Sequence, residues 1–335
     1  METGDGFDGK VATHDLRGRH VRAAGIRVWL AEAGPRDGHP VLLVHGLAAR
    51  GAIWRRVMPA LAARGLRLLV PDLPGHGQSD GKRHRATYSP RFFARVLGDL
   101  ADELGIARLS VAGNSLGGVV AARLALADPD RVAHLVLIDS AGLAPDGVPW
   151  STRLLYLPFA LSALLGAAPS PLWTRLLLQR AVVADPAQAG ELAETLGEHP
   201  PLPVAVRRSA AALLGPDGRI AHDLAALRVP TLFIWGEGDV QFPVALAEAA
   251  VRRMPMARLA RIAGVGHVPQ WEAPEAVAAL VADFVERAGI DEGQATAVVG
   301  ARATGARGAA LRLRSRRTIS RQRQHPPLGG PPTPH

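Results

Sequence analysis

Ser115 lies in a short pattern of residues suited to covalent chemistry on a carbonyl group. The pattern Gly113-Asn114-Ser115-Leu116-Gly117 follows the apolar run Leu109 to Ala112 and precedes the helix-forming stretch Val119 to Leu126. A sharp strand-to-helix turn exposes its middle side chain, and flanking glycines let neighbouring backbones pass closely. The start of the next helix favours negative charge. We predict that the Ser115 hydroxyl attacks a carbonyl carbon; the alternative is a glycine-rich turn with a structural serine.

Other residues that could take part in this chemistry follow predicted strands. They are His45-Gly46-Leu47, Asp239 and His267. In open α/β sheets, ligands bind outside the carboxyl ends of the strands. The chain order serine, acid, histidine is one of the orders in which a catalytic triad occurs, so we expect the three side chains to meet.

Each of these residue types has a role in nucleophilic catalysis. A serine hydroxyl is a poor nucleophile until an imidazole takes its proton, and His267 is the candidate base. A carboxylate must orient the imidazole, and Asp239 is the candidate acid. The N–H of Leu116 is a candidate donor to the oxyanion. The alternatives are a loop-capping role for Asp239 and a hydrogen-bonded core role for His267.

Buried-type strands alternate with helices along most of the chain. Apolar runs at 40–44, 66–70, 109–112, 134–138 and 231–235 predict strands covered on both faces. The pattern Val21 to Leu30 predicts a hairpin strand, and Ile53 to Arg64 predicts an amphipathic helix. The expected fold is therefore α/β, with a mostly parallel sheet and helices on both faces.

A long helical stretch interrupts this alternation. Ninety-one residues, rich in Leu, Ala and Arg, separate Asp139 from the next strand at Thr231. An insertion of this length is a lid or a second subdomain. We predict a helical cap after the sixth sheet strand. The predicted organisation is a flexible leader (1–19), a core (20–142 and 222–289), the cap (143–221) and a disordered Arg/Pro/Gly-rich tail (290–335).

Composition limits the compartment and the partners. The net charge is +9, but eight arginines and two acids from 290 to 335 contribute +6 of it, so we expect no nucleic-acid partner. No cysteine is present, which excludes disulfides, thiolate metal sites and a cysteine nucleophile. The first twenty residues have no apolar signal region, and Pro158 interrupts the apolar run Leu154 to Ala168. We expect a cytoplasmic protein without a membrane span.

From about residue 20 to 288 the sequence resembles the cap-bearing α/β hydrolases. The resemblance is carried by His45-Gly46, Asp72-Leu73-Pro74-Gly75-His76-Gly77-Gln78-Ser79, Gly113-Asn114-Ser115-Leu116-Gly117-Gly118, Trp235-Gly236-Glu237-Gly238-Asp239, and Gly266-His267 with Glu272-Ala273-Pro274. It implies an α/β-hydrolase fold with a triad of Ser115, Asp239 and His267. It also implies a second oxyanion donor at Leu47 and a structural role for His45. Some relatives place the acid after the preceding strand, which makes Asp139 the alternative acid.

The expected activity is hydrolysis of an ester or similar carbonyl substrate of apolar character through an acyl-enzyme. The substrate is a small molecule, no cofactor or metal is expected, and we make no prediction of oligomeric state. The alternatives are a carbon–carbon bond hydrolase of the meta-cleavage-product type and a ligand-binding receptor with little turnover. Possible substrate contacts are Asn114, Val268, Trp173 and Arg180, with Arg175 as a further cation.

Overall fold

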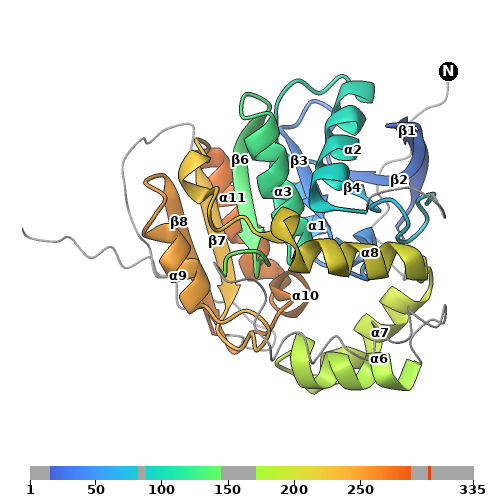
Figure 1. Ribbon diagram of the computed structural model, residues 1–335, viewed down its shortest axis with the longest axis vertical. Helices are drawn as coiled ribbons and strands as arrows, with labels where there is room; N and C mark the ends of the chain where they lie inside the picture. The colour runs from blue at the N-terminus through green and yellow to red at the C-terminus, as the bar shows by residue number, and fades with distance from the viewer. Residues whose placement is uncertain (1–15, 82–87, 145–170, 288–300, 303–335) are drawn as a thin grey trace, which may run out of the picture.

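The computed structural model describes residues 16–81, 88–144, 171–287 and 301–302. Its centre is a sheet with the strand order β1-β2-β4-β3-β5-β6-β7-β8-β9 (Figure 1). The pairs β1–β2 and β2–β4 are antiparallel and the others are parallel. The strands are β1 (Gly18–Ala23), β2 (Ile26–Ala33), β3 (Pro40–Val44), β4 (Arg67–Pro71), β5 (Leu109–Asn114), β6 (Val132–Ile138), β7 (Thr231–Gly236), β8 (Ala257–Ala263) and β9 (Ala301–Arg302). The predicted α/β fold with a mostly parallel sheet is confirmed.

Helices cover both faces of the sheet. On one face lie α2 (Pro90–Glu103), α3 (Leu116–Ala127) and α9 (Ala245–Val251), and on the other α1 (Met58–Ala63), α10 (Pro269–Glu272) and α11 (Pro274–Arg287). Successive strand residues point to opposite faces, so Leu42 belongs to one apolar core and Leu43 to the other. Strands buried on both faces explain the continuous apolar runs of the sequence.

The described elements between β6 and β7 are helical. We call residues 171–226 the helical insertion. It contains α6 (Pro171–Leu177), the π-helical turn η2 (Leu178–Val182), α7 (Ala189–Gly197), α8 (Pro203–Leu214) and three 3-10 turns, η3 (Pro186–Gln188), η4 (Pro216–Gly218) and η5 (Leu224–Ala226). The predicted apolar run 154–168 lies outside the described residues. Within the described parts of the chain, no helix combines the length and the apolar character that crossing a bilayer requires.

Three elements differ from the sequence prediction. The stretch Val21 to Leu30 is not one strand, because Ala24 and Gly25 have φ of 49° and 71° and form a tight turn between β1 and β2. The predicted helix at 53–64 is a 3-10 turn, η1 (Gly51–Trp54), followed by α1 with Pro59 in its first turn. In the predicted tail, Ala301 and Arg302 pair with the end of β8.

Three glycines allow α3 to pack closely against the ends of the central strands. An added Cβ on Gly113 would lie 2.1 Å from the Gly117 carbonyl oxygen, and one on Gly117 would lie 2.2 Å from that of Val44. A Cβ on Gly118 would lie 2.4 Å from the Ser140 hydroxyl oxygen. The turn that carries Ser115 is therefore fixed by contacts with the backbone of β3 and with the Ser140 side chain in the loop after β6.

His45 connects the loop after β3 to the loop after β4. Its Nδ1–H donates to the Gly46 carbonyl at 2.8 Å, and its Nε2 accepts from the Leu73 N–H at 2.9 Å. Burial lowers the pKa of His45 to about 4 and that of the neighbouring His76 to about 3. Both rings are therefore neutral at physiological pH. The hydrogen bonds of His45 support the structural role that the resemblance implied.

Gly117→Ala should lower the free energy of unfolding by about 2–3 kcal/mol, because the backbone oxygens around Gly117 cannot move away from a new methyl group. Gly98→Ala in α2 is the matched control. There the nearest atom is 3.8 Å away, and the free energy should rise by about 0.5–1 kcal/mol. Denaturant titrations measure both values. A Gly117→Ala protein as stable as the wild type would contradict the close packing.

His45→Gln should flatten the dependence of stability on pH. The unfolded chain protonates its histidines below pH 6.5, whereas buried His45 stays neutral down to about pH 4. The contribution of neutral His45 to the free energy of unfolding is therefore complete above pH 6.5. It declines as the pH falls toward 4, with a slope of at most about 1.4 kcal/mol per pH unit. The His45→Gln protein should lack this contribution to the slope between about pH 4 and pH 6.5. An unaltered slope, measured beside exposed His222→Gln as the control, would show that His45 does not titrate in this way.

Candidate active site

Ser115 has a backbone conformation that residues other than glycine rarely adopt. Its φ is 56° and its ψ is −117°, directly between β5 and α3. The Ser115 N–H donates to the Ile138 carbonyl at 3.0 Å, and its carbonyl accepts from Gly118 and Ala141. These bonds attach the turn to β6, to the loop that follows it and to the first turn of α3. The hydroxyl is thereby held at the carboxyl edge of the sheet.

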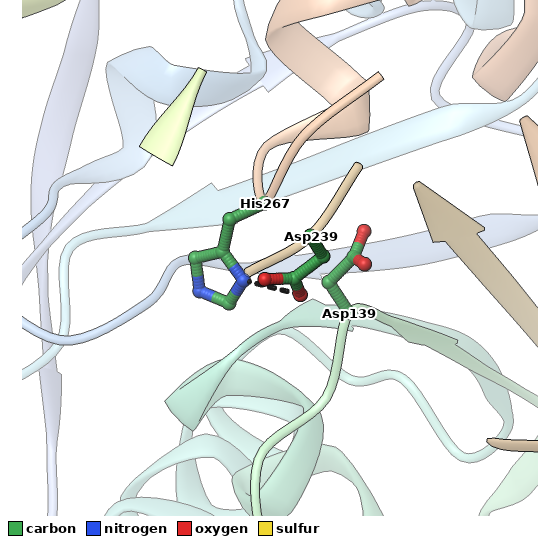
Figure 2. Close-up of side chains that lie close together, drawn as sticks. All are labelled: Asp139, Asp239 and His267. Carbon is green, nitrogen blue, oxygen red and sulfur yellow. Dashed lines mark hydrogen bonds and ion pairs between the residues drawn. The ribbon is translucent and has the colours of Figure 1, made fainter. Parts of the chain in front are cut away.

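His267 and Asp239 form a buried hydrogen-bonded pair. His267 Nδ1 lies 2.9 Å from Asp239 Oδ2, and both residues are at most 6% exposed (Figure 2). The other carboxylate oxygen, Oδ1, accepts from the N–H groups of Gln241 at 2.7 Å and Phe242 at 3.1 Å. Asp239 is therefore oriented by its own loop, and Nε2 is the His267 nitrogen that Asp239 does not engage.

Asp139 lies next to this pair without contacting His267 directly. Figure 2 shows Asp239 between His267 and Asp139. The Gly236 N–H lies 3.2 and 3.3 Å from the two oxygens of Asp139. Burial, together with the charge of Asp239, raises the pKa of Asp139 well above its ordinary value. The carboxylate that faces His267 is that of Asp239.

A cavity of about 730 Å³ lies between the sheet edge and the helical insertion. Its core side includes Ser115, His267 and the loop residues Gly46–Ala49, and its outer side is formed by α6, η2, α7 and α8. Most of the lining side chains are apolar, among them Ile53, Leu178, Leu192 and Val206. A cavity of this volume is in the range that accommodates drug-sized organic molecules.

The two predicted oxyanion donors lie beside Ser115, one at the start of α3 and the other in the loop after β3. Leu116 is the first residue of α3, so its N–H has no partner within the helix. Leu47 lines the cavity. An added Cβ on the preceding Gly46 would lie 3.3 Å from the Ser115 Cβ, so this loop passes directly over the serine.

The predicted substrate contacts differ in their positions. Asn114 and Val268 line the cavity, but Arg180 is exposed and is not among the lining residues. The side chain of Trp173 lies outside the described part of α6. Arg175, which is exposed, lines the cavity together with Glu194 of α7. Arg180 is exposed on η2, and its expected contact with substrate stays a prediction.

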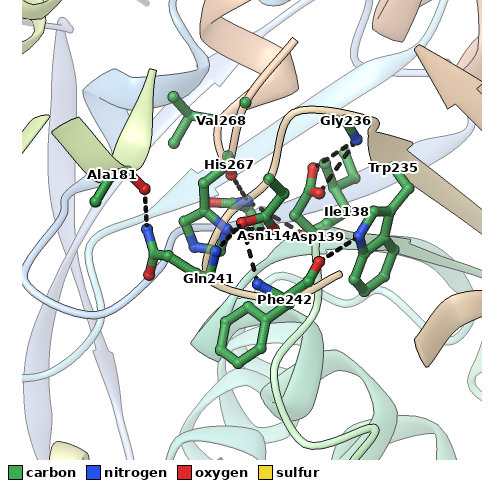
Figure 3. A network of polar contacts seen from close by, with 12 residues as sticks. Asn114, Ile138, Asp139, Ala181, Trp235, Gly236, Gln241, Phe242, His267 and Val268 are labelled. Carbon is green, nitrogen blue, oxygen red and sulfur yellow. Dashed lines mark hydrogen bonds and ion pairs between the residues drawn. The ribbon is translucent and has the colours of Figure 1, made fainter. Parts of the chain in front are cut away.

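Asn114 has structural partners that its position in the motif does not reveal. Its side-chain NH₂ group donates to the carbonyls of Ile138 at 3.2 Å and His267 at 3.0 Å (Figure 3). These two bonds join the serine turn, the end of β6 and the histidine loop. The side chain that we expected to bind substrate thus holds the site together.

Two further residues, to which the sequence analysis assigned no role, connect the site to the helical insertion. The Glu272 carboxylate accepts from the N–H groups of Ala184 at 2.7 Å and Gly266 at 3.0 Å, and so fixes the loop of His267. Arg50 is 2% exposed, its Nε donates to the Thr195 carbonyl at 2.8 Å, and its guanidinium pairs with Glu198. Isolated charged residues in a sequence give no signal of such long-range partners.

The described residues contain one group of three side chains that could together contact a metal ion. It consists of Asp139, Asp239 and His267, whose ligand atoms lie within 4.8 Å of one another. The hydrogen bonds among these residues and to backbone N–H groups explain why they lie so close together.

Comparisons with known proteins agree with this architecture. The family model described as alpha/beta hydrolase fold matches residues 39–274. The chain is 34% identical over 279 residues to the magnesium-chelatase 30 kDa subunit of Rhodobacter capsulatus, covering 79% of this chain and 93% of that protein. It is 32% identical over 286 residues to 2-hydroxymuconate semialdehyde hydrolase of Pseudomonas sp. strain CF600, covering 81% and 94%.

A solved structure shows the same fold. A thermophilic esterase from Thermogutta terrifontis superposes with a TM-score of 0.69 at 26% identity, over 82% of this chain and 99% of the esterase. With the family model matching most of the sequence, the chain belongs to the α/β-hydrolase fold family of enzymes.

Proposed function

We propose that this α/β hydrolase cleaves esters of apolar character with Ser115 as nucleophile, His267 as general base and Asp239 as the orienting acid. The observation that carries the proposal is an apolar cavity with Ser115 and His267 on one wall, where His267 Nδ1 is 2.9 Å from Asp239. Such a pair fixes the ring and leaves Nε2 to exchange protons with the serine.

In the proposed reaction, the Ser115 hydroxyl oxygen attacks the ester carbonyl carbon while His267 Nε2 accepts its proton. The negative charge moves to the carbonyl oxygen, which accepts hydrogen bonds from the N–H groups of Leu116 and Leu47. His267 then returns the proton to the leaving alkoxide, and an acyl-enzyme forms. Water, activated by the same imidazole, releases the acid and restores Ser115.

The helical insertion is proposed to act as the cap that selects the substrate. The outer wall of the cavity comes from α6, η2, α7 and α8, and Arg50 attaches α7 to the loop that carries Leu47. Apolar walls favour binding through buried hydrocarbon, which supports an apolar acyl or alcohol group rather than a polyhydroxylated one.

A carbon–carbon bond hydrolase is the second candidate. The similarity to 2-hydroxymuconate semialdehyde hydrolase favours it. A dienoate substrate carries a carboxylate that needs a cation in the pocket. Among the described residues that line the cavity, Arg175 is the only cation, and it shares the wall with Glu194. A carboxylate on the same wall as Arg175 disfavours a second carboxylate from the substrate, which supports the ester over the dienoate.

A third candidate, of another class, is a ligand-binding protein with little turnover. The similarity to a protein named as a magnesium-chelatase subunit is compatible with it, because that name does not describe ester hydrolysis. In that case, esters and other apolar ligands would raise the melting temperature of the protein without being consumed.

The ester and dienoate readings predict different relative rates. For p-nitrophenyl acetate, butyrate, hexanoate and octanoate, kcat/KM should rise about fourfold per added CH₂ until the cavity is filled. A meta-cleavage dienoate should react weakly. In the Ser115→Ala control, ester turnover should fall about 10⁴-fold or more. A dienoate that reacts a hundredfold faster than the best ester would support the second candidate. No turnover of either substrate, together with a melting temperature raised by them, would support the third.

A further inference from the structure

Asp139 is a buried carboxyl group that the proposed triad does not use. It follows β6, is fully buried, and has a φ of 41°, which residues other than glycine rarely adopt. The N–H of Asp139 donates to the Ile234 carbonyl, and its side chain receives the Gly236 N–H. This strained backbone directs the carboxyl group toward the end of β7, where the loop of Asp239 begins.

The carboxyl groups of Asp139 and Asp239 lie close together in the interior of the protein. Both residues are buried, and each contributes an oxygen to a group of atoms that lie within 4.8 Å of one another. Two ionised carboxylates at such a separation, away from water, repel strongly, so one of them carries a proton.

The hydrogen bonds to the two groups indicate which carboxyl group holds the proton. Asp239 accepts from three donors, the N–H groups of Gln241 and Phe242 and His267 Nδ1. Asp139 receives only the Gly236 N–H among the described residues. Donors stabilise the ionised form, so the charge belongs on Asp239 and the proton on Asp139.

The charged groups around Asp139 also favour its protonated form. The titratable groups that face it are Asp239 from the loop after β7, His267 from the loop after β8, and Glu272 from α10. Burial and the two neighbouring carboxylates raise the pKa of Asp139 well above its ordinary value.

We propose that Asp139 is a protonated positioning residue, whose O–H donates to the Asp239 carboxylate and holds it against His267 Nδ1. The inference rests on the proposed function, since it concerns how the acid of that triad is oriented. Asp139 does not line the cavity, so it acts through Asp239 and not on the substrate. It is thus a partner of the triad acid rather than a replacement for it.

Matched substitutions separate this role from that of an ionised acid. In Asp139→Asn the side-chain NH₂ replaces the donating O–H, so kcat should stay within about threefold of the wild type. Asp139→Ala leaves Asp239 without this donor, and kcat should fall about tenfold to a hundredfold while KM changes less than about twofold. Equal loss in both variants, or wild-type kcat in both, would overturn the proposal.

An infrared measurement tests the proton itself and does not depend on turnover. The Ser115→Ala protein at pH 7 should show the C=O stretch of a protonated carboxylic acid, and part of that band should disappear in Ser115→Ala/Asp139→Asn. Asp72 and Glu272, whose pKa values are also raised by burial, are common to both proteins and cancel in the difference spectrum.

The results distinguish a failure of the proposed function from a failure of the proposal about Asp139. No difference between the spectra means that Asp139 is ionised, and the proposal is wrong. If Ser115→Ala retains full ester turnover, the proposed function fails, while the difference spectrum still decides the protonation of Asp139. If Asp139→Ala does not fold, the kcat of Asp139→Asn and its difference spectrum decide whether Asp139 is a protonated positioning residue.

Discussion

The backbone of Ser115 is the constraint on which the rest of the site depends. A residue other than glycine at a φ of 56° costs on the order of 1–3 kcal/mol, so the surrounding structure must hold it there. The Ser115 N–H and carbonyl are bonded to Ile138, Gly118 and Ala141. These contacts place the end of β5, the end of β6 and the start of α3 in one fixed relation, and they determine where the hydroxyl lies.

Hydrogen bonds connect the turn of Ser115 to loops from distant parts of the sequence. Asn114, beside the serine, donates to the His267 carbonyl (Figure 3). The His267 N–H donates to the Val182 carbonyl of the helical insertion at 2.7 Å. Gln241, beside the predicted acid, donates to Ala181 at 3.0 Å. The loops of all three predicted triad residues are thereby tied to one another or to η2, which limits their independent motion.

The same contacts imply that the helical insertion is part of the site rather than an appendage. Arg56 donates to Gln188 of η3 and to the Trp271 carbonyl of α10, and its guanidinium lies 4.0 Å from the Trp271 ring centre. Arg50 makes a second connection, from the loop over Ser115 to α7. Displacement of α7 would therefore disturb the loop that carries the predicted oxyanion donor Leu47.

The fold could be predicted from local patterns, whereas part of the site could not. Continuous apolar runs identified the buried strands, and the glycines around Ser115 identified the turn. Alanine seldom adopts a φ of 49°, so the sequence did not indicate the turn at Ala24, and the stretch Val21 to Leu30 was predicted as one strand of a hairpin instead of two. The partners of Asn114 and the exposure of Arg180 depend on which distant segments meet, and no local pattern records that information.

The identity of the nucleophile is the central claim, and covalent labelling tests it most directly. The protein is incubated with a fluorophosphonate ester, digested with trypsin and examined by mass spectrometry. The predicted result is one adduct per chain on the peptide Leu109–Arg123, located at Ser115 and absent from the Ser115→Ala protein. Adducts on Ser110 or another serine, or an unlabelled protein that still hydrolyses esters, would contradict the assignment.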